Sequence, residues 1–115
     1  MKLKDKYSSL FQFFAGYFHQ DYDLDYPTTA DAVRTFVHDA NPETALRVSE
    51  DLRHLLQESN NDEALGQALY ELGSCYMARF KSSSDPKWQS NREWLTKEVL
   101  AILDAHLAEN RARSA

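Results

Sequence analysis

Cysteine, glycine and proline are all scarce in this chain of 115 residues. The single cysteine, Cys75, excludes an internal disulfide and a zinc site built from paired cysteines, so a reducing cytoplasm is the expected compartment. Three glycines and three prolines argue against a β-rich protein with many tight turns. No apolar run approaches the ~18 residues of a membrane span, and the N-terminal run is short and broken by Gln12, unlike a signal peptide. These absences predict one soluble domain over residues 1–115.

Basic residues are also unevenly spread. No Lys or Arg occurs between Lys6 and Arg34; residues 7–33 carry a charge of −4, and residues 34–78 carry −5. Binding to nucleic acid requires a basic face that neutralises phosphates, so this class of partner is not expected. An acidic surface instead attracts basic proteins. The alternative is that the acidity only keeps the protein in solution.

Aromatic residues are concentrated near the N-terminus, because residues 7–26 hold eight of the fourteen in the chain. Tyr7 and Phe11 lie on a second apolar stripe, so the predicted helix is apolar around much of its circumference. A helix of this kind packs centrally in a bundle. Its main stripe follows the helical spacing: Leu10, Phe13, Phe14, Tyr17 and Phe18.

Capping residues mark the starts of further predicted helices. Thr28, followed by Asp31, opens a short helix that ends near Ala40. Asn41 with proline after it opens a third helix, which ends near Glu58.

The second half of the chain predicts two more helices and a long loop. A turn over residues 59–62 precedes a fourth helix, which is expected to bury apolar residues as far as Tyr76 and to contain Cys75. Residues 79–89 form the loop, and we find no convincing strand. Ser90 with Glu93 is a capping box that opens the last and longest helix, fraying from Asn110 onward. The prediction is an all-α, single-domain bundle of about five helices.

The segment between the first two helices carries three alternating aspartates, Asp21, Asp23 and Asp25. This spacing matches the first ligands of an EF-hand calcium loop, which also requires Gly at its sixth position and Glu at its twelfth. Tyr26 and Ala32 occupy those positions, so the match fails.

Three interpretations of this segment stay open. A looser metal site could use His19 with the three aspartates, or the segment could simply be a solvated connection. The interpretation that we favour is a protein-binding patch, because Tyr22 and Tyr26 are of the type that anchors interfaces. We expect the segment to be extended or irregular, which would place carboxylates on one side and tyrosine rings on the other.

Motifs for catalysis are missing. The chain has no HExxH motif, nucleophile elbow or glycine-rich phosphate loop. His106 lies on the apolar stripe of the last helix and is expected to be a hydrogen-bonded core residue, and Cys75 a structural one. An enzyme is therefore not the favoured class.

Several motifs together resemble a known family. Residues 10–14 (LFQFF) with residues 16–23 (GYFHQDYD) resemble the N-terminal signature of immunity proteins from bacterial contact-dependent growth inhibition and related polymorphic toxin systems. The other matching motifs occur in the same order along the chain: Thr29–Val33, Leu72-Gly73 followed by Tyr76, and Arg92–Leu95.

The resemblance implies a cytoplasmic, non-catalytic protein without cofactors that neutralises the C-terminal toxin domain delivered by a neighbouring cell. Many such toxins are nucleases with basic active-site surfaces, so charge complementarity would drive binding. Neither nucleic acid nor membrane is an expected partner. The predicted toxin-binding residues are Asp21, Tyr22, Asp23, Asp25, Tyr26 and Asp31. The reserve candidates are Asp39, Glu43, Glu50, Asp51, Glu58, Asp62 and Glu63.

Two other hypotheses come from different classes. The first is a small metal-binding or metal-dependent protein that uses His19 with Asp21, Asp23 and Asp25, for which metal titration is the test. The second is a helical adaptor for an unrelated basic protein.

Overall fold

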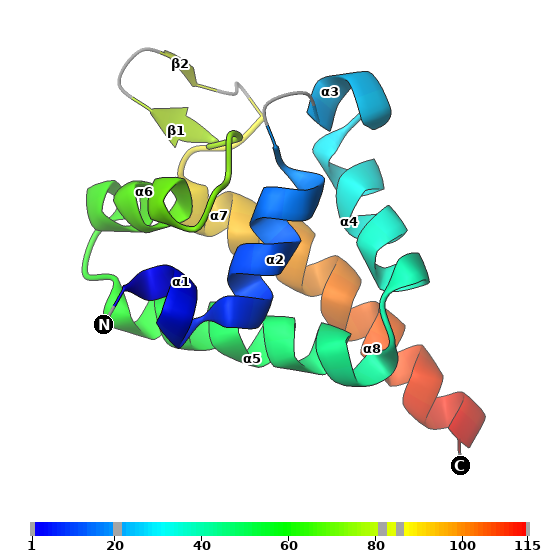
Figure 1. Ribbon diagram of the computed structural model, residues 1–115. Helices are drawn as coiled ribbons and strands as arrows, with labels where there is room; N and C mark the ends of the chain where they lie inside the picture. The colour runs from blue at the N-terminus through cyan, green and yellow to red at the C-terminus, as the bar shows by residue number, and fades with distance from the viewer. Residues whose placement is uncertain (1, 20–21, 81–82, 85–86, 115) are drawn as a thin grey trace.

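Helix α2 (Ser8–Tyr17) runs through the middle of the protein in the computed structural model, which describes residues 2–19, 22–80, 83–84 and 87–114 (Figure 1). It buries Leu10, Phe13 and Phe14. The Phe13 ring lies 4.7 Å from Phe36 and 5.6 Å from Phe18, between ring centroids. The predicted central aromatic helix is therefore confirmed.

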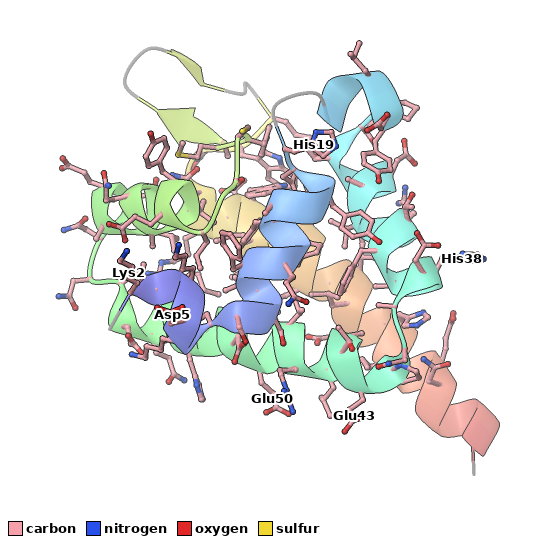
Figure 2. The ribbon with its side chains drawn as sticks, in the orientation of Figure 1. Lys2, Asp5, His19, His38, Glu43 and Glu50 are labelled. Carbon is pink, nitrogen blue, oxygen red and sulfur yellow. The ribbon has the colours of Figure 1, made fainter. Side chains whose placement is uncertain are left out.

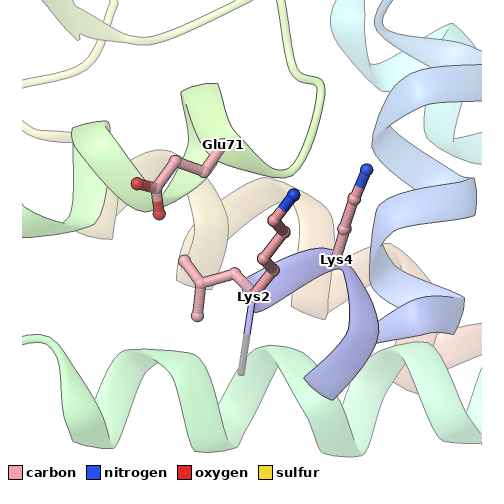
Figure 3. A pocket seen from close by; sticks show the side chains of 4 residues that line it. Lys2, Lys4 and Glu71 are labelled. Carbon is pink, nitrogen blue, oxygen red and sulfur yellow. The ribbon is translucent and has the colours of Figure 1, made fainter.

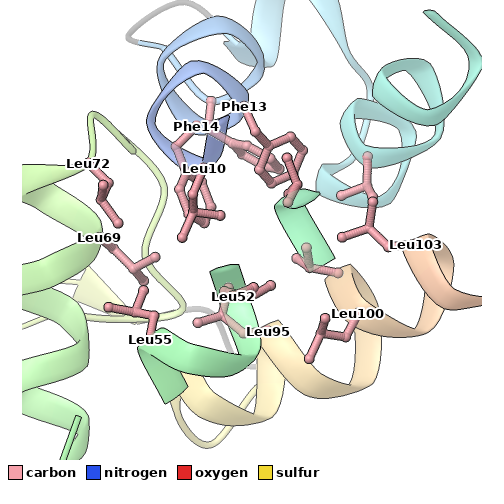
Figure 4. Close-up of a cluster of buried hydrophobic side chains, with 14 of the residues drawn as sticks. Leu10, Phe13, Phe14, Leu52, Leu55, Leu69, Leu72, Leu95, Leu100 and Leu103 are labelled. Atoms are coloured by element: carbon pink, nitrogen blue, oxygen red, sulfur yellow. The ribbon is translucent and has the colours of Figure 1, made fainter. Parts of the chain in front are cut away.

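The other elements surround α2, and the all-α fold class is confirmed. Leucines from α5, from the end of α6 and from the C-terminal helix converge on the buried face of α2 (Figure 4). The elements are α1 (Leu3–Lys6), α3 (Tyr22–Asp25), α4 (Thr29–Asp39), α5 (Pro42–Glu58), α6 (Asp62–Glu71), β1 (Arg79–Phe80), β2 (Ser83–Ser84), α7 (Asn91–Trp94), the π-helix η1 (Leu95–Leu100) and α8 (Ala101–Ser114).

Side-chain caps start the main helices where the sequence predicts them. The Thr28 side chain accepts a hydrogen bond from the Asp31 backbone N–H, and Asn41 accepts one from Thr44 at 2.8 Å. Ser90 accepts one from the Glu93 N–H at 3.0 Å. Each cap satisfies a backbone donor that has no partner within the first turn of its helix.

Helix α6 is shorter than predicted. It ends at Glu71 because Gly73 adopts a left-handed conformation, with φ at +88°. The N–H groups of Gly73 and Ser74 donate back to Tyr70 and Leu69, each at 3.0 Å, in a Schellman motif. The prediction that the helix continues to Tyr76 was wrong.

The segment after Gly73 follows a non-helical path back to the core. The Cys75 N–H donates to the carbonyl of Phe18 at 2.7 Å, at the end of α2. The Tyr76 ring then packs against Trp94, with 4.6 Å between ring centroids. The Cys75 side chain is exposed, so the predicted buried, helical cysteine was also wrong.

The predicted long loop contains a short hairpin. Strands β1 and β2 pair antiparallel, with Arg79 opposite Ser84 and Phe80 opposite Ser83. Residues 81–82 and 85–86 of this loop lie outside the described residues.

The C-terminal helix is continuous from Asn91, as predicted, but it contains a π-helical turn. This turn buries Glu98, which is 6% exposed. The Glu98 carboxylate accepts hydrogen bonds from the Thr29 hydroxyl and the Trp94 indole N–H, both at 2.6 Å. Its other oxygen lies 3.6 Å from Nζ of Lys87. The carboxylate therefore links η1 to α4 and α7 and pairs with Lys87 at the surface.

His106 pairs with Asn110 on α8, at 3.1 Å between Nε2 and the amide nitrogen. The imidazole is hydrogen-bonded, as predicted, but it is half-buried rather than in the core. The side chains of residues 111–115 lie outside those described, so fraying of the tail stays a prediction.

Glu58, at the end of α5, contacts the N-terminal segment, and we expect this contact to be sensitive to acid. Its carboxylate accepts hydrogen bonds from Lys6 at 2.8 Å and from the Tyr7 hydroxyl, and these bonds lower the pKa of Glu58 below its ordinary value of 4.5. Burial, followed by the hydrogen bond to Glu58, raises the pKa of Tyr7.

We expect the Glu58 contact to stabilise the fold above pH 4.5 and to be lost as the pH falls through the lowered pKa of Glu58. The reason is that the unfolded chain binds this proton first. Urea unfolding of wild type and of Glu58→Gln, at neutral and acid pH, measures the effect, and the variant should lose less stability on acidification. Glu50→Gln, on the exposed side of the same helix, is the control and should follow wild type. Identical pH dependence in Glu58→Gln and wild type would contradict the prediction.

Candidate functional site: a tyrosine stack bordered by carboxylates

Two tyrosines stack where α2 ends and α4 begins. The rings of Tyr17 and Tyr26 lie 6.1 Å apart between centroids, with 26° between their planes. Tyr17 also meets Phe36 of α4 edge-on at 5.4 Å. Both tyrosines are half-buried, so their rings extend the core to the surface.

Carboxylates border this stack. Asp39, at the end of α4, lies 3.4 Å from the Tyr17 hydroxyl, which donates to it. Burial, followed by the charge of Asp39, raises the pKa of Tyr17. Burial, followed by the charges of Asp25 and Asp39, raises the pKa of Tyr26. We call Tyr17, Asp25, Tyr26 and Asp39 the acidic tyrosine surface.

The three alternating aspartates do not lie on an extended strand. The backbone forms a single helical turn, α3, over Tyr22–Asp25, so the predicted extended conformation and its separation of faces were wrong there. His19 pairs with this turn, with Nε2 at 3.1 Å from Oδ2 of Asp25. Figure 2 shows His19 near the end of α2, close to α3. A helix of four residues is too short for hydrophobic periodicity to reveal it.

The predicted site residues are only partly brought together. Of the predicted toxin-binding residues, Asp25 and Tyr26 belong to the acidic tyrosine surface. Asp21 and the side chains of Tyr22 and Asp23 lie outside the described part of the chain. Asp31 sits in the first turn of α4, where its carboxylate accepts from the Thr28 hydroxyl at 2.9 Å and lies 3.6 Å from Arg34. Asp31 therefore contributes to the helix start, in addition to any role in binding.

Two of the reserve candidates for toxin binding accept hydrogen bonds from other residues of the protein. Glu58 accepts from Lys6 and Tyr7, as described above. Asp62 accepts from the backbone N–H groups of Asn91, at 3.2 Å, and Arg92, at 3.1 Å. It thereby caps α7, which starts close by. These contacts favour a structural role for both carboxylates.

The remaining reserve candidates differ in exposure. Asp51 is half-buried, and burial raises its pKa against the opposing charges of His54 and Arg47. The exposed carboxylates of Glu43, Glu50 and Glu63 have no ion pair among the described residues. Figure 2 shows Glu43 and Glu50 on α5, away from His19 and α3. Among the reserve residues, only Asp39 joins the acidic tyrosine surface.

Sequence reasoning missed one member of this surface. The helical spacing placed Tyr17 in the core stripe of α2. The hydroxyl of Tyr17 was the one signal in the sequence that this residue also reaches the surface. Phenylalanine at this position would fill the core without a polar group at the surface.

The described part of the molecule holds no metal site, but it does hold a surface cavity. No group of three or more His, Cys, Asp or Glu residues there could hold a metal ion. Asp21 and Asp23 lie outside that search, so the metal hypothesis stays a prediction. A cavity of about 480 Å³ lies between α1 and α6 and is lined by Lys2, Leu3, Lys4 and Glu71 (Figure 3).

Comparison with known families decides the class of the protein. The model of a family described as CdiI immunity protein matches residues 6–103. The chain belongs to the CdiI immunity protein family. Neither the comparison with curated proteins nor that with solved structures found a match.

Membership of the CdiI family confirms the resemblance noted in the sequence. It indicates a toxin-neutralising function and a cognate toxin as the partner, and it points to a non-catalytic inhibitor. Among the described residues, the helices of this CdiI protein include none that is long and apolar enough to cross a membrane.

Proposed function

We propose that this CdiI family member binds its cognate toxin, a basic nuclease domain, in the cytoplasm through the acidic tyrosine surface. The contact also includes the neighbouring predicted residues Asp21, Tyr22, Asp23 and Asp31. The observation that carries the proposal is the stacked Tyr17–Tyr26 pair with Asp25 and Asp39 beside it. Aromatic rings next to exposed charges combine an anchor with a polar rim, as interface hot spots do.

Charge supports the choice of partner. The 27 residues of segment 7–33 contain four aspartates and no Lys or Arg, so α2 and α3 present no basic side chain to a partner. A nuclease that holds a phosphate backbone needs a basic face. Opposite charges on the two surfaces would accelerate association and make it sensitive to salt.

The test is calorimetric binding to the toxin domain encoded beside this gene, together with growth of cells that express both proteins. We expect saturable binding, an association rate that falls as salt rises, and protection of the cells. Absence of binding and of protection would refute the proposed function. Binding that is indifferent to salt would refute the charge mechanism while retaining the immunity function.

A further inference from the structure

Leu24 is the most exposed of the large apolar side chains that the structure describes. It is 81% exposed, compared with 67% for Tyr70 and 38% for Leu46. Isolated exposed apolar residues are common on protein surfaces. Exposure alone therefore does not mark Leu24 as a binding residue, and its position in the fold is the relevant feature.

Leu24 projects from α3, and the two residues that follow it, Asp25 and Tyr26, contact α2 and the residues at its C-terminal end. His19, just after the C-terminal end of α2, pairs with Asp25 at 3.1 Å. Tyr26 stacks on Tyr17 of α2. The turn that carries Leu24 is thus fixed before any partner arrives, which reduces the entropy lost on binding.

The surroundings of Leu24 are acidic. The neighbouring Asp25 has a side chain that is 56% exposed, and Asp39 lies beside the same tyrosine stack. An anionic membrane, a nucleic acid or a second copy of this surface would bring like charges together, which is unfavourable. A basic protein surface would bring opposite charges together around a central apolar contact.

We propose that Leu24 is the apolar anchor of the toxin interface and enters a socket on the toxin whose rim carries Lys or Arg. This inference rests on the proposed function. In it, Asp25 and Asp39 supply the salt-sensitive part of the affinity, while burial of Leu24 supplies a part that salt does not screen.

The experiment measures the toxin affinity of Leu24→Ala at about 0.1 M and about 1 M salt, where the screening length falls from ~10 Å to ~3 Å. We expect binding to weaken about thirtyfold at both salt concentrations, as for a residue at an interface hot spot. Leu46→Ala, on α5, is the matched control and should bind like wild type. Leu24→Met keeps the apolar volume and should stay within about tenfold of wild type.

Circular dichroism checks that each variant is folded, and the exposure of Leu24 makes a folding defect unexpected. Wild-type affinity in Leu24→Ala, with weakened binding after substitution of Asp25 and Asp39, would overturn the anchor and leave the proposed function intact. Failure of the native chain to bind the toxin would overturn both. Self-association of the native chain that Leu24→Ala abolishes would assign the socket to a second copy and overturn the proposal.

Discussion

Replacing Asp25 and Asp39 together with lysine is expected to weaken toxin binding by about 3 kcal/mol, because like charges then face each other across the interface. That loss corresponds to about a hundredfold in the dissociation constant. Both side chains are more than half exposed, at 56% and 54%, so the substitutions leave the core intact. The change should lie mainly in the association rate and should shrink as salt increases, because exposed charges are screened. Stopped-flow association and calorimetry at low and high salt measure both effects.

The matched control reverses two carboxylates elsewhere. Glu50→Lys with Glu63→Lys changes the net charge by the same amount, on α5 and α6, at exposed residues that form no ion pair with any described residue. If net charge alone steers the encounter, both double variants will slow association equally. A much larger loss in the Asp25/Asp39 variant supports the acidic tyrosine surface. The reverse ranking would place the interface on α5 and α6 and contradict the proposed site.

Local sequence signals were sufficient to predict most of the helices. The aromatic stripe of α2 and the caps at Thr28, Asn41 and Ser90 each act within a few residues of the chain, so they can be read without tertiary information. The errors arose where a local signal was ambiguous. Apolar spacing continues past Glu71, but Gly73 ends the helix by adopting a backbone conformation that other residues disfavour.

The candidate site was predictable only in part, because it depends on contacts between residues that are distant in the sequence. Asp25 and Tyr26 stood out as an acidic, aromatic segment. Their proximity to Tyr17 and Asp39 depends on how α4 passes the end of α2, which no spacing in the sequence encodes. The exposure of Leu24 follows from α3, a helical turn too short to predict.

The π-helical turn was also not predictable from the sequence. Its buried carboxylate, that of Glu98, is the group whose loss we expect to destabilise the fold most. Glu98→Ala should lower the free energy of unfolding by about 3 kcal/mol, because buried donors then lack an acceptor. The Trp94 indole is fully buried, and the Thr29 hydroxyl faces the same oxygen of Glu98. Denaturation by urea measures the loss. Glu98→Gln retains one side-chain acceptor and should lose less.

Glu109→Ala is the control, since Glu109 is exposed on α8 and its change should stay within about 0.5 kcal/mol. A similarly small change in Glu98→Ala would contradict the importance of the buried network.

The glutamine variant, Glu98→Gln, also separates the effect of Glu98 on stability from its effect on toxin binding. Thr29 is the first residue of α4, shortly after Tyr26, so Glu98 fixes the start of the helix that carries Asp39. Glu98 itself is buried and cannot touch the toxin. If folded Glu98→Gln binds the toxin within a few fold of wild type, the carboxylate stabilises the fold alone. A larger loss, with the secondary structure intact, would mean that the π-helical turn also positions the acidic tyrosine surface.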